Sequence, residues 1–600
     1  MKCNIVAQAF ETIEGQSSRI AITQSLADLF KKANPEEIQE LSYLCLGVLN
    51  PPYVGTQFGI AQKSMLKIVA RILDVPESAL EKEMSHVGDL GLVIAKHSFP
   101  VHKVALTLRQ VYQALSIIEK IGGSGSQEKK AQLVHELLLK LDALSAKYVV
   151  RIILGTLRLG FSDMTVLDAL SWMETGDKSV REVLEHAYNV CADIGLIART
   201  LKEEGLDAIK DMRIHVGVPI RPAAAERLPS AEAIIEKIGP CVAQPKLDGF
   251  RLQVHVDNTH KEPVIHFFSR NLIDMSAMFP ELVAVCKQLP VKTMIVDGEA
   301  IVYDPNTHTY VPFQETVKRK RKHGIDQMVS ELPLQLNMFD IMYLDGQSLL
   351  NDHQKTRRLL LKKIFTSYQQ QAVSPVRSRQ LSLFEGGGVE ISEQTLQVIE
   401  EVSVHTAKEL EHYFMQEIAS GLEGVVVKKT DSRYQAGKRS FNWIKLKYQA
   451  SDKLKDTLDV VILGYYPGRG KRAAFGIGAF LVGVYNRKLD GYQTVAKIGT
   501  GLSDQEWVDL KKQCDAYAVK QQPKNVFCAK ELYPAVWVDP TIVCEVLADE
   551  ITFSPLHTAG KTDDQLGLAL RFPRFVTYRP DKDSTQTTSA AELLSLKKNK

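Results

Sequence analysis

The first two hundred residues carry the hydrophobic spacing of amphipathic helices. In the segment AQLVHELLLKLDAL (131–144), apolar side chains recur every three or four residues, which is the repeat of one helix face. They are Leu133, Val134, Leu137, Leu138, Leu141 and Leu144. Glycine and serine in IGGSGSQEKK (121–130) predict a loop between helices. Glycine and proline cluster again in HVGVPIRPAAAERLP (215–229), which indicates a boundary near residue 215.

From about residue 240 the pattern changes to short strands, for example in TMIVDGEAIVY (293–303), LPLQLNMFDIMYL (332–344) and EGVVVKK (423–429). After residue 451 the predicted strands are closely spaced and separated by turn signals, which is typical of a small barrel. These later strands are DTLDVVILGYYPG, GAFLVGVYN, YQTVAKIGTG and PTIVCEVLADEIT. A stretch rich in Gln, Ser and Gly, residues 367–394, predicts a flexible insertion.

A chain of 600 residues is too long for one hydrophobic core. The patterns divide it into a helical domain (1–214), an α+β domain (215–450) and a β-barrel (451–600). Composition is that of a globular protein, with 45% hydrophobic and 24% charged residues, and no apolar run is long enough to span a membrane. The N-terminus predicts no secretion signal. Net charge is +3, which neither requires nor excludes a nucleic-acid partner.

The eight cysteines are scattered, so the sequence predicts neither a zinc cluster nor a disulfide framework, and we expect a reduced intracellular protein.

One short segment suggests covalent chemistry. In AQPKLDGFRLQVHV (243–256), Lys246 precedes Asp-Gly, and Arg251 follows five positions later. A lysine attacks phosphorus only as the neutral amine, which burial or neighbouring cations favour. Arg251 could supply such a charge or hold a phosphate, and Gly249 could let the backbone approach a ligand closely. The alternative is a charged hairpin on a surface.

Later strands add residues that suit a nucleotide. Asp297 and Glu299 are two apart on one strand and suit a metal ion or a ribose, unless they are a solvated strand face. Phe339 lies on the more polar face of its strand, which suits a ring that stacks on a base. The alternative is a core aromatic ring. Glu423 begins the strand of EGVVVKK and is a further candidate metal ligand.

Lys445 and Lys447 share a strand face with Trp443 and suit a polyphosphate, although a charged strand edge is the simpler interpretation. Together these residues form the inventory of nucleotidyl transfer through a lysine–nucleotide intermediate.

The order of these motifs resembles the ATP-dependent DNA ligases of the archaeal and eukaryotic replicative type, within the nucleotidyltransferase superfamily that also holds RNA ligases and mRNA-capping enzymes. The resemblance rests on KLDGFR, SRN, DGE, FD, EGVVVKK and WIKLK, on the later KIGTGLSD, DEITFSP and LALRFPRFVTYRPDK, and on RIILGTLRLGFSDMTVLDAL near the N-terminus. It implies an all-α DNA-binding domain, an α+β adenylation domain and an OB-fold domain.

The resemblance implies roles for individual residues. Lys246 is the expected adenylylated lysine, Phe339 stacks on adenine, Glu299 holds the ribose and lies near metal, and Glu423 is a metal ligand. The remaining expected nucleotide or phosphate contacts are Arg251, Arg270, Arg439, Lys445 and Lys447, with Arg571 and Lys582 of the barrel acting on the ATP triphosphate.

One position departs from the family pattern. The family usually has glutamate two residues before the lysine, where it accepts a hydrogen bond from the adenine amino group. Here that residue is Gln244, whose amide oxygen accepts the same bond without a charge.

The implied cofactors are ATP and Mg²⁺ (or Mn²⁺), and the implied substrate is nicked double-stranded DNA, in replication, repair or recombination. We expect a monomer in the cytoplasm, associated with the nucleoid. The basic run Lys318–Lys322 and, by resemblance, Arg151, Arg158 and the loop LRLGFSD are candidate DNA contacts.

The predicted insertion contains Gln380, Leu381, Ser382, Leu383 and Phe384, which resemble the short peptide that binds the bacterial sliding clamp. A tether that presents two leucines and a phenylalanine could fill an apolar pocket of a partner. The alternative is local packing of these residues onto their own domain.

Two other functions remain open at this point. An RNA ligase or capping enzyme would share the lysine motif, but the large helical part and the RFPRF and RPDK segments favour a DNA ligase. A non-catalytic DNA-binding or clamp-tethered scaffold has no need of the whole set Lys246, Glu299, Glu423 and Lys445. An NAD-dependent ligase would carry a four-cysteine zinc cluster, which the sequence does not show.

Overall fold

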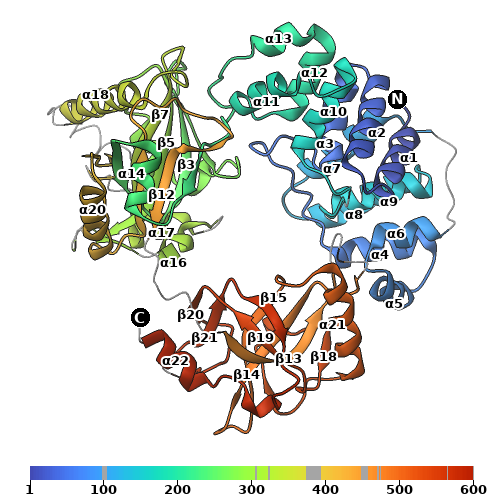
Figure 1. Cartoon of the computed structure of the whole chain (residues 1–600). Coiled ribbons are helices and arrows are strands. Elements are labelled where there is room, and N and C mark those ends of the chain that lie inside the picture. Colours follow the sequence, from blue (N-terminus) through green and yellow to red (C-terminus); the bar gives the residue numbers. More distant parts are fainter. Residues whose placement is uncertain are drawn as a thin grey trace. The chain divides into compact units, whose positions relative to one another are not determined.

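The structure is a computed structural model that describes residues 1–97, 105–157, 159–304, 307, 309–311, 313–321, 324–372, 394–447, 457–468, 472, 475–563 and 565–598. The chain forms two compact units. The first comprises Met1–Ile72 and Ser98–Tyr448, and the second comprises Leu73–His97 and Gln449–Lys600. Figure 1 shows the helices and strands of the whole chain.

The N-terminal part of the described chain is helical, as its periodicity predicts. Its helices are α1 (Cys3–Glu14), α2 (Arg19–Lys32), α3 (Pro35–Cys45), α4 (Gln62–Leu73), α5 (Glu77–Val87), α6 (Leu90–Lys96), α7 (Leu108–Lys120), α8 (Ser126–Leu138), α9 (Ala143–Ile153), α10 (Asp163–Thr175), α11 (Arg181–Val190), α12 (Ile194–Glu204) and α13 (Leu206–Lys210). Helices α5 and α6 belong to the second unit.

The periodic segment 131–144 is not one helix. Helix α8 ends at Leu138, and Asp142 begins α9 by accepting a hydrogen bond from the Ser145 backbone N–H at 3.0 Å. Leu141 lies between the helices and is nevertheless buried. The apolar spacing therefore predicts the burial of Val134, Leu137, Leu138 and Leu141 correctly, but Leu133 and Leu144 are only half-buried and the break is not apparent from it.

The strand-rich part of the first unit begins near residue 224. Its elements are β1 (Ala224–Arg227), α14 (Ala231–Ile238), β2 (Cys241–Pro245), β3 (Phe250–Asp257), β4 (Val264–Ser269), η1 (Ser276–Met278), α15 (Pro280–Cys286), β5 (Thr293–Asp304), β6 (Thr309–Tyr310), α16 (Phe313–Thr316), η2 (Val317–Arg319), α17 (Ile325–Glu331), β7 (Leu334–Leu344), β8 (Gln347–Ser348), α18 (Gln354–Ala372), β9 (Leu396–Val398), β10 (Val402–Val404), α20 (Ala407–Ala419), β11 (Gly424–Lys428) and β12 (Arg439–Lys447).

The predicted insertion begins later than its composition suggests. Helix α18 continues to Ala372, so residues 367–372 are helical rather than irregular. Residues 373–393, which include the clamp-like peptide, lie outside the described residues.

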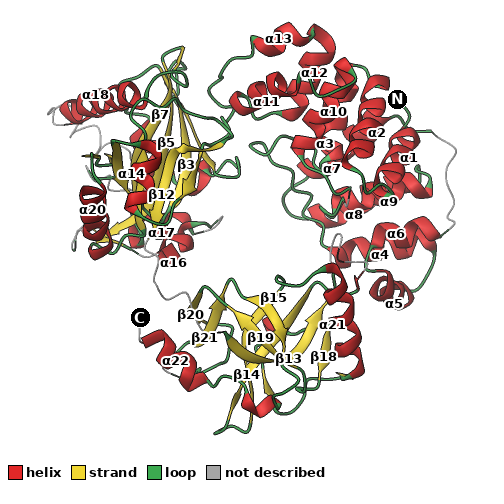
Figure 2. Cartoon of the chain, in the orientation of Figure 1, coloured by secondary structure: helices red, strands yellow, loops and turns green. Residues whose placement is uncertain are grey.

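Two largely antiparallel sheets form this part of the first unit, drawn as yellow strands in Figure 2. One has the order β4-β3-β5-β7-β8, with β6 on β5 and β9 on β7, and the other has the order β1-β12-β11-β2-β10. Helices α15 and α18 bury apolar side chains against the first sheet, and α14 and α20 do so against the second.

The two sheets also share buried apolar side chains. One cluster joins Ile295 of β5 and Met342 of β7 to Trp443 of β12. The chain passes from the second sheet to the first between β2 and β3, through residues 246–249. The lysine motif therefore lies where the two sheets meet.

The second unit is built mainly of antiparallel strands. Its later elements are β13 (Leu458–Tyr466), β14 (Ala479–Asn486), β15 (Gly491–Ile498), α21 (Asp504–Ala516), β16 (Ala518–Val519), β17 (Val526–Phe527), η4 (Lys530–Leu532), β18 (Val536–Val538), β19 (Val543–Leu547), β20 (Glu550–Ser554), β21 (Gly567–Arg571), β22 (Arg574–Tyr578), η5 (Ser584–Gln586) and α22 (Ala590–Lys598). The main sheet has the order β16-β18-β13-β14-β15-β17, with β19 joining β13 to β22, and β20 pairs with β21.

Within the described residues, no helix combines the length and apolar character needed to cross a membrane.

All eight cysteines are free thiols, and all except Cys528 are buried. The predicted absence of a disulfide framework is confirmed.

Candidate active site

Lys246 directly follows β2 and is held at the junction of the two sheets. Its backbone N–H donates to the Gly424 carbonyl at 2.8 Å, so the position of the main chain is fixed by the neighbouring strand. Its Nζ forms an ion pair with the carboxylate of Glu423. The side chain is 20% exposed, which leaves it accessible to a ligand. A surface hairpin, the simpler interpretation of this motif, is therefore wrong.

Gly249 permits close packing at the turn after the lysine. A Cβ added there would lie 2.3 Å from the Ala300 carbonyl oxygen of β5, which no side chain tolerates. The Gly249 N–H donates to Glu299 Oε1 at 3.0 Å. The sequence explained this glycine by close approach of a ligand, but the close neighbour is the strand β5, and the glycine ties the lysine turn to Glu299.

Glu299 has an unusual electrostatic environment. Burial raises the pKa of its carboxyl to about 7, although the charges of Lys246 and Arg251 and the Gly249 hydrogen bond each pull the pKa down. The carboxyl is therefore near its midpoint of protonation at neutral pH. Perturbed groups of this kind are concentrated at functional sites.

Positive charges surround the same place. Burial lowers the pKa of Lys445, and the charges of Arg439, Lys447, Lys246 and Arg270 lower it further. Lys447 also forms an ion pair with Glu423. Burial opposes ionisation of Glu423, yet Lys246 and Lys447 hold its pKa below the usual value. The arrangement suits a ligand with several negative charges.

Arg251 has a different environment from the one that its spacing suggests. Its Nη1 donates to the Ala223 carbonyl at 2.7 Å, and its Nη2 contacts Asp297 Oδ2 at 2.9 Å. Asp297 is fully buried and also accepts a hydrogen bond from the Tyr434 hydroxyl at 2.6 Å. Asp297 is thus part of an internal network, and the idea that it shares a solvated or metal-binding face with Glu299 is wrong.

The sequence patterns did not predict a buried cluster of three charged side chains close to Phe339. Arg357 donates to both carboxylate oxygens of Asp340, at 2.7 and 3.1 Å, and Lys428 Nζ lies 3.6 Å from the same carboxylate. Burial lowers the pKa of Lys428 to about 8, against the pull of Asp340. The available signal was a lysine at the end of the apolar run EGVVVK, which points into the protein.

Phe339 is partly buried next to these charges. Lys428 Nζ lies 4.9 Å and the Arg251 guanidinium carbon 5.6 Å from the centre of its ring. Trp443 packs edge-on against the ring, with centroids 6.0 Å apart. Phe339 also packs against the apolar cluster of Leu247, Ile301 and Ile399, and Leu247 directly follows the lysine. The ring is thus fixed close to Lys246, and its stacking on a base stays a prediction.

Gln244, the position that departs from the family pattern, is buried in β2. Its Nε2 donates to Glu401 Oε2 at 2.8 Å. Glu401 precedes β10, the strand that pairs with β2. No spacing pattern indicates this partner, because it lies 157 positions away.

Arg571 and Lys582 belong to the second unit. Arg571 contacts Glu550 at 3.3 Å, and Lys582 forms an ion pair with Asp459. Their expected action on a triphosphate stays a prediction.

Two predicted DNA contacts are wrong. Arg319, inside the basic run, is buried and paired with Glu281, and Arg151 is buried with both terminal nitrogens on Glu14, at 2.9 and 3.1 Å. Neither guanidinium can reach DNA without breaking a buried ion pair. Arg158 and Lys322 lie outside the described residues.

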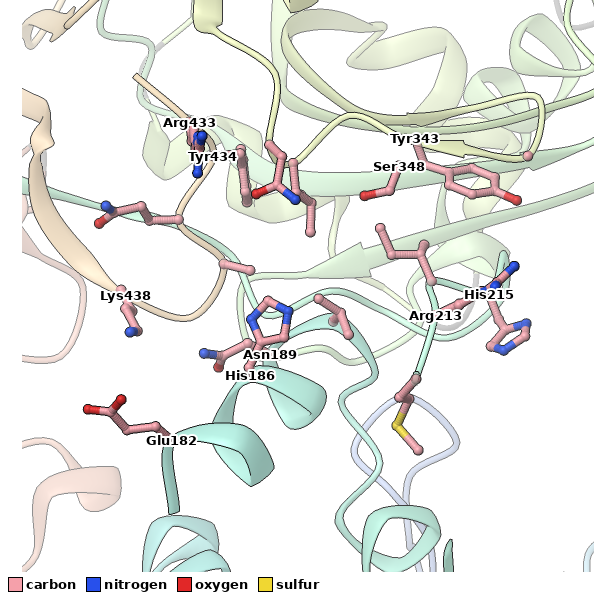
Figure 3. A pocket seen from close by; sticks show the side chains of 18 residues that line it. Glu182, His186, Asn189, Arg213, His215, Tyr343, Ser348, Arg433, Tyr434 and Lys438 are labelled. Carbon is pink, nitrogen blue, oxygen red and sulfur yellow. The ribbon is translucent and has the colours of Figure 1, made fainter. Parts of the chain in front are cut away.

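A separate cavity of about 710 Å³ lies elsewhere in the first unit, between α11 and the loops after β7 and β11 (Figure 3). Arg213, His215, Arg433 and Lys438 are among its lining residues. None of the predicted nucleotide-site residues lines it.

The carboxylates near Lys246 fit one kind of metal site. Within the part of the chain that the structure describes, no group of three or more His, Cys, Asp or Glu side chains is arranged to hold a metal ion. Magnesium is usually held by one or two carboxylates together with substrate phosphates. Glu299 and Glu423, beside the cation cluster, match that pattern. They do not match a site in which protein side chains supply all the ligands.

The paired sheets and the lysine between them define a nucleotidyltransferase. Three family models match the chain: "DNA ligase N terminus" over residues 3–171, "ATP dependent DNA ligase domain" over 222–447 and "ATP dependent DNA ligase C terminal region" over 473–582. The chain belongs to the ATP-dependent DNA ligase family, an enzyme family, so the resemblance seen in the motifs is confirmed.

Similar proteins span the whole chain. A "Probable DNA ligase" of Dictyoglomus thermophilum is 42% identical over 99% of this chain and 97% of its own length. "DNA ligase 2" of Thermofilum pendens is 37% identical over 99% and 97%. The solved structure "Pmar-Lig_PreS3" has a TM-score of 0.54 at 17% identity and covers 96% of this chain and 99% of its own. The helical N-terminal region, the nucleotidyltransferase domain and the C-terminal β half-barrel are thus those of an ATP-dependent ligase.

Proposed function

We propose that this enzyme seals nicks with a 5′-phosphate and a 3′-hydroxyl in duplex DNA, through a lysine–AMP and then a DNA–adenylate intermediate. One observation carries the proposal: Lys246 lies with Glu423 and Glu299 at a sheet junction, next to the cation cluster around Lys445. A nucleophile, carboxylates and cations that could bind phosphates are the groups that the proposed reaction needs, and their proximity supports it.

In the first step, Nζ of Lys246 gives up its proton to solvent and attacks the α-phosphorus of ATP. A nitrogen–phosphorus bond forms, the bond to the β-phosphate oxygen breaks, and pyrophosphate leaves with the electron pair. Lys445 and its neighbouring cations stabilise the triphosphate and the departing pyrophosphate. Phe339 stacks on the adenine ring, and Glu299 accepts a hydrogen bond from the ribose.

In the second step, an oxygen of the DNA 5′-phosphate attacks the same phosphorus and releases the lysine amine. In the third step, the 3′-hydroxyl attacks the 5′-phosphate, and AMP leaves as the hydroxyl proton is lost. Arg270 and Arg439 reach the 5′-phosphate from the turn after β4 and the start of β12. Arg251 acts indirectly, because its contacts with Asp297 and Ala223 fix the walls of the site.

Glu299 and Glu423 would hold Mg²⁺ together with the phosphates of ATP. Bound there, the ion offsets negative charge that develops on the phosphates.

The three-domain organisation supports a division of labour. We assign the helical region (1–214) to DNA binding, residues 215–450 to adenylation, and the β half-barrel (451–600) to an OB fold that brings Arg571 and Lys582 to the triphosphate in the first step. We infer a monomer, and we keep sliding-clamp binding by residues 380–384 as a separate proposal. It fails if deletion of those residues leaves binding to a purified bacterial clamp unchanged.

The test of the function is a two-stage label transfer. The enzyme is incubated with Mg²⁺ and ATP labelled at the α-phosphate, and nicked duplex DNA is added afterwards. Label should attach to the protein, move to DNA and leave as AMP while the nick closes. Lys246→Ala should abolish labelling while DNA binding persists. If wild-type protein takes no label, the proposed reaction is wrong, and a non-catalytic scaffold is the better description.

A further inference from the structure

The amide of Gln244 can be oriented from its contacts. The side chain is 2% exposed, and its Nε2 lies 2.8 Å from Glu401 Oε2. An ionised carboxylate only accepts hydrogen bonds, so the NH₂ group must face Glu401, and the oxygen must face the other way. Within the described residues, no hydrogen bond to Gln244 Oε1 is found, and this atom is not sealed from solvent.

Glu401 is itself held in place. Gln354 Nε2 donates to the same oxygen, Oε2, at 2.8 Å, and Arg358 Nε lies 3.9 Å from it. Arg358 is anchored in turn on the Ile399 carbonyl. The Glu401 side chain is only 11% exposed, and these partners hold its carboxylate in place. Residues of α18 and of the segment before β10 thus hold the Glu401 carboxylate in place. The Glu401 carboxylate in turn orients the Gln244 amide.

We propose that Glu401 is a positioning residue for base selection: it locks Gln244 so that only the amide oxygen faces the purine. This inference rests on the proposed function, and on the expectation from the family resemblance that Gln244 contacts the base next to Lys246. Adenine presents a 6-amino donor, which the locked oxygen accepts. Guanine presents a 6-oxo acceptor, which the locked oxygen repels.

The lock explains why glutamine, and not glutamate, suits this chain. A freely rotating glutamine could turn its NH₂ toward a 6-oxo group and accept guanine as readily as adenine. A glutamate at position 244 would place two carboxylates within hydrogen-bond distance at a buried position, which is strongly unfavourable. The pair therefore needs one amide and one carboxylate.

The experiment compares Gln244→Glu, Glu401→Gln and the exchange Q244E/E401Q with the wild type. The first readout is KM and kcat for protein labelling with ATP and with GTP. Glu401→Gln should lower the preference for ATP over GTP by about tenfold, which is the effect of one hydrogen bond gained or lost. Gln244→Glu should raise KM for ATP by at least about tenfold.

The exchange variant is the decisive one. It restores one donor and one acceptor with the carboxylate toward the base, so its ATP preference should return to within about threefold of the wild type. Glu400→Gln, which alters an exposed neighbour, is the matched control and should change neither nucleotide preference nor KM.

A second readout separates selection from folding. Every variant should still seal nicked DNA that already carries a 5′-adenylate, which shows that it is folded, although Gln244→Glu should do so more slowly because the adenine of the adenylate occupies the same pocket. If the two single changes combine additively, without rescue, Glu401 does not position Gln244. If the wild type itself takes no label from ATP, the proposed function fails instead, so the two failures are distinguishable.

Discussion

At the scale of single residues, the chemistry of the site depends on the partners of its two carboxylates. Glu423 contacts two lysines, whereas Glu299 is held by a backbone N–H and by burial. This difference gives the two carboxyl groups opposite behaviour: the pKa of Glu423 is lowered, and that of Glu299 is raised to about 7. Two neighbouring carboxyl groups with diverging pKa values are typical of acid–base and metal chemistry.

The raised pKa of Glu299 predicts a pH-dependent cost to stability. The folded protein binds the Glu299 proton more tightly than the unfolded chain does, so this stabilisation is complete below pH 4.5 and is lost as pH rises through about 7. Relative to Glu299→Gln, the wild type should lose on the order of 1–3 kcal/mol of unfolding free energy between pH 4.5 and 8. Denaturant unfolding with chelator and without nucleotide measures this, and equal pH slopes for the two proteins would refute it.

The residues that sequence predicted well are those of the motifs that carry the family resemblance. Lys246, Glu299, Glu423 and Lys445 come together as that resemblance implies, although they are far apart in the sequence. The contacts of Gln244 and Arg251 could not be predicted from the sequence, because their partners Glu401 and Asp297 lie 157 and 46 positions away. No pattern of spacing reveals a hydrogen bond between strands whose pairing is unknown.

At the scale of elements, the site depends on how closely β5 approaches the turn between β2 and β3. Most strands of this region follow from apolar alternation, but the crossing from one sheet to the other does not, because it is set by tertiary pairing. The break between α8 and α9 was not predicted because Leu141, which lies within it, is buried like Leu137 and Leu138 at the end of α8.

Gly249→Ala tests that close approach. The added methyl group would lie 2.3 Å from the Ala300 carbonyl, so the turn must move away from β5 and lose the hydrogen bond to Glu299. We expect about 1–3 kcal/mol of destabilisation and at least tenfold slower protein labelling with ATP. Gly122→Ala, where a methyl group meets no atom within 4 Å, is the control. An active, fully stable Gly249→Ala protein would contradict the packing described.

Asp340→Asn tests the buried charged group that joins β7, α18 and β11. The change leaves Arg357 and Lys428 without their carboxylate, and breaking a buried pair in this way costs about 3–5 kcal/mol. Chemical unfolding should show that loss. Asp431→Asn, at an exposed pair with Lys429 3.6 Å away, should change stability by less than about 0.5 kcal/mol.

At the scale of the whole molecule, composition and periodicity separated helical from strand-rich parts. They could not show that residues 73–97 group with the C-terminal unit, because that grouping rests on contacts distant in sequence. The charge distribution was also hidden: a net charge of +3 says nothing of the local cation cluster around Lys445.

The division into two compact units predicts separable unfolding. Scanning calorimetry should resolve two transitions, and ATP with Mg²⁺ should raise the one that belongs to the first unit, because only the folded site is adenylylated. Lys246→Ala should keep both transitions while the shift from covalent labelling disappears. A single transition that moves as a whole would show that the units are thermodynamically coupled.

The ion pair between Lys246 and Glu423 has a consequence for the resting enzyme. In this contact the lysine amine and a carboxylate that would hold Mg²⁺ occupy each other. Both groups therefore become available together when ATP and Mg²⁺ separate them, and neither is left exposed alone.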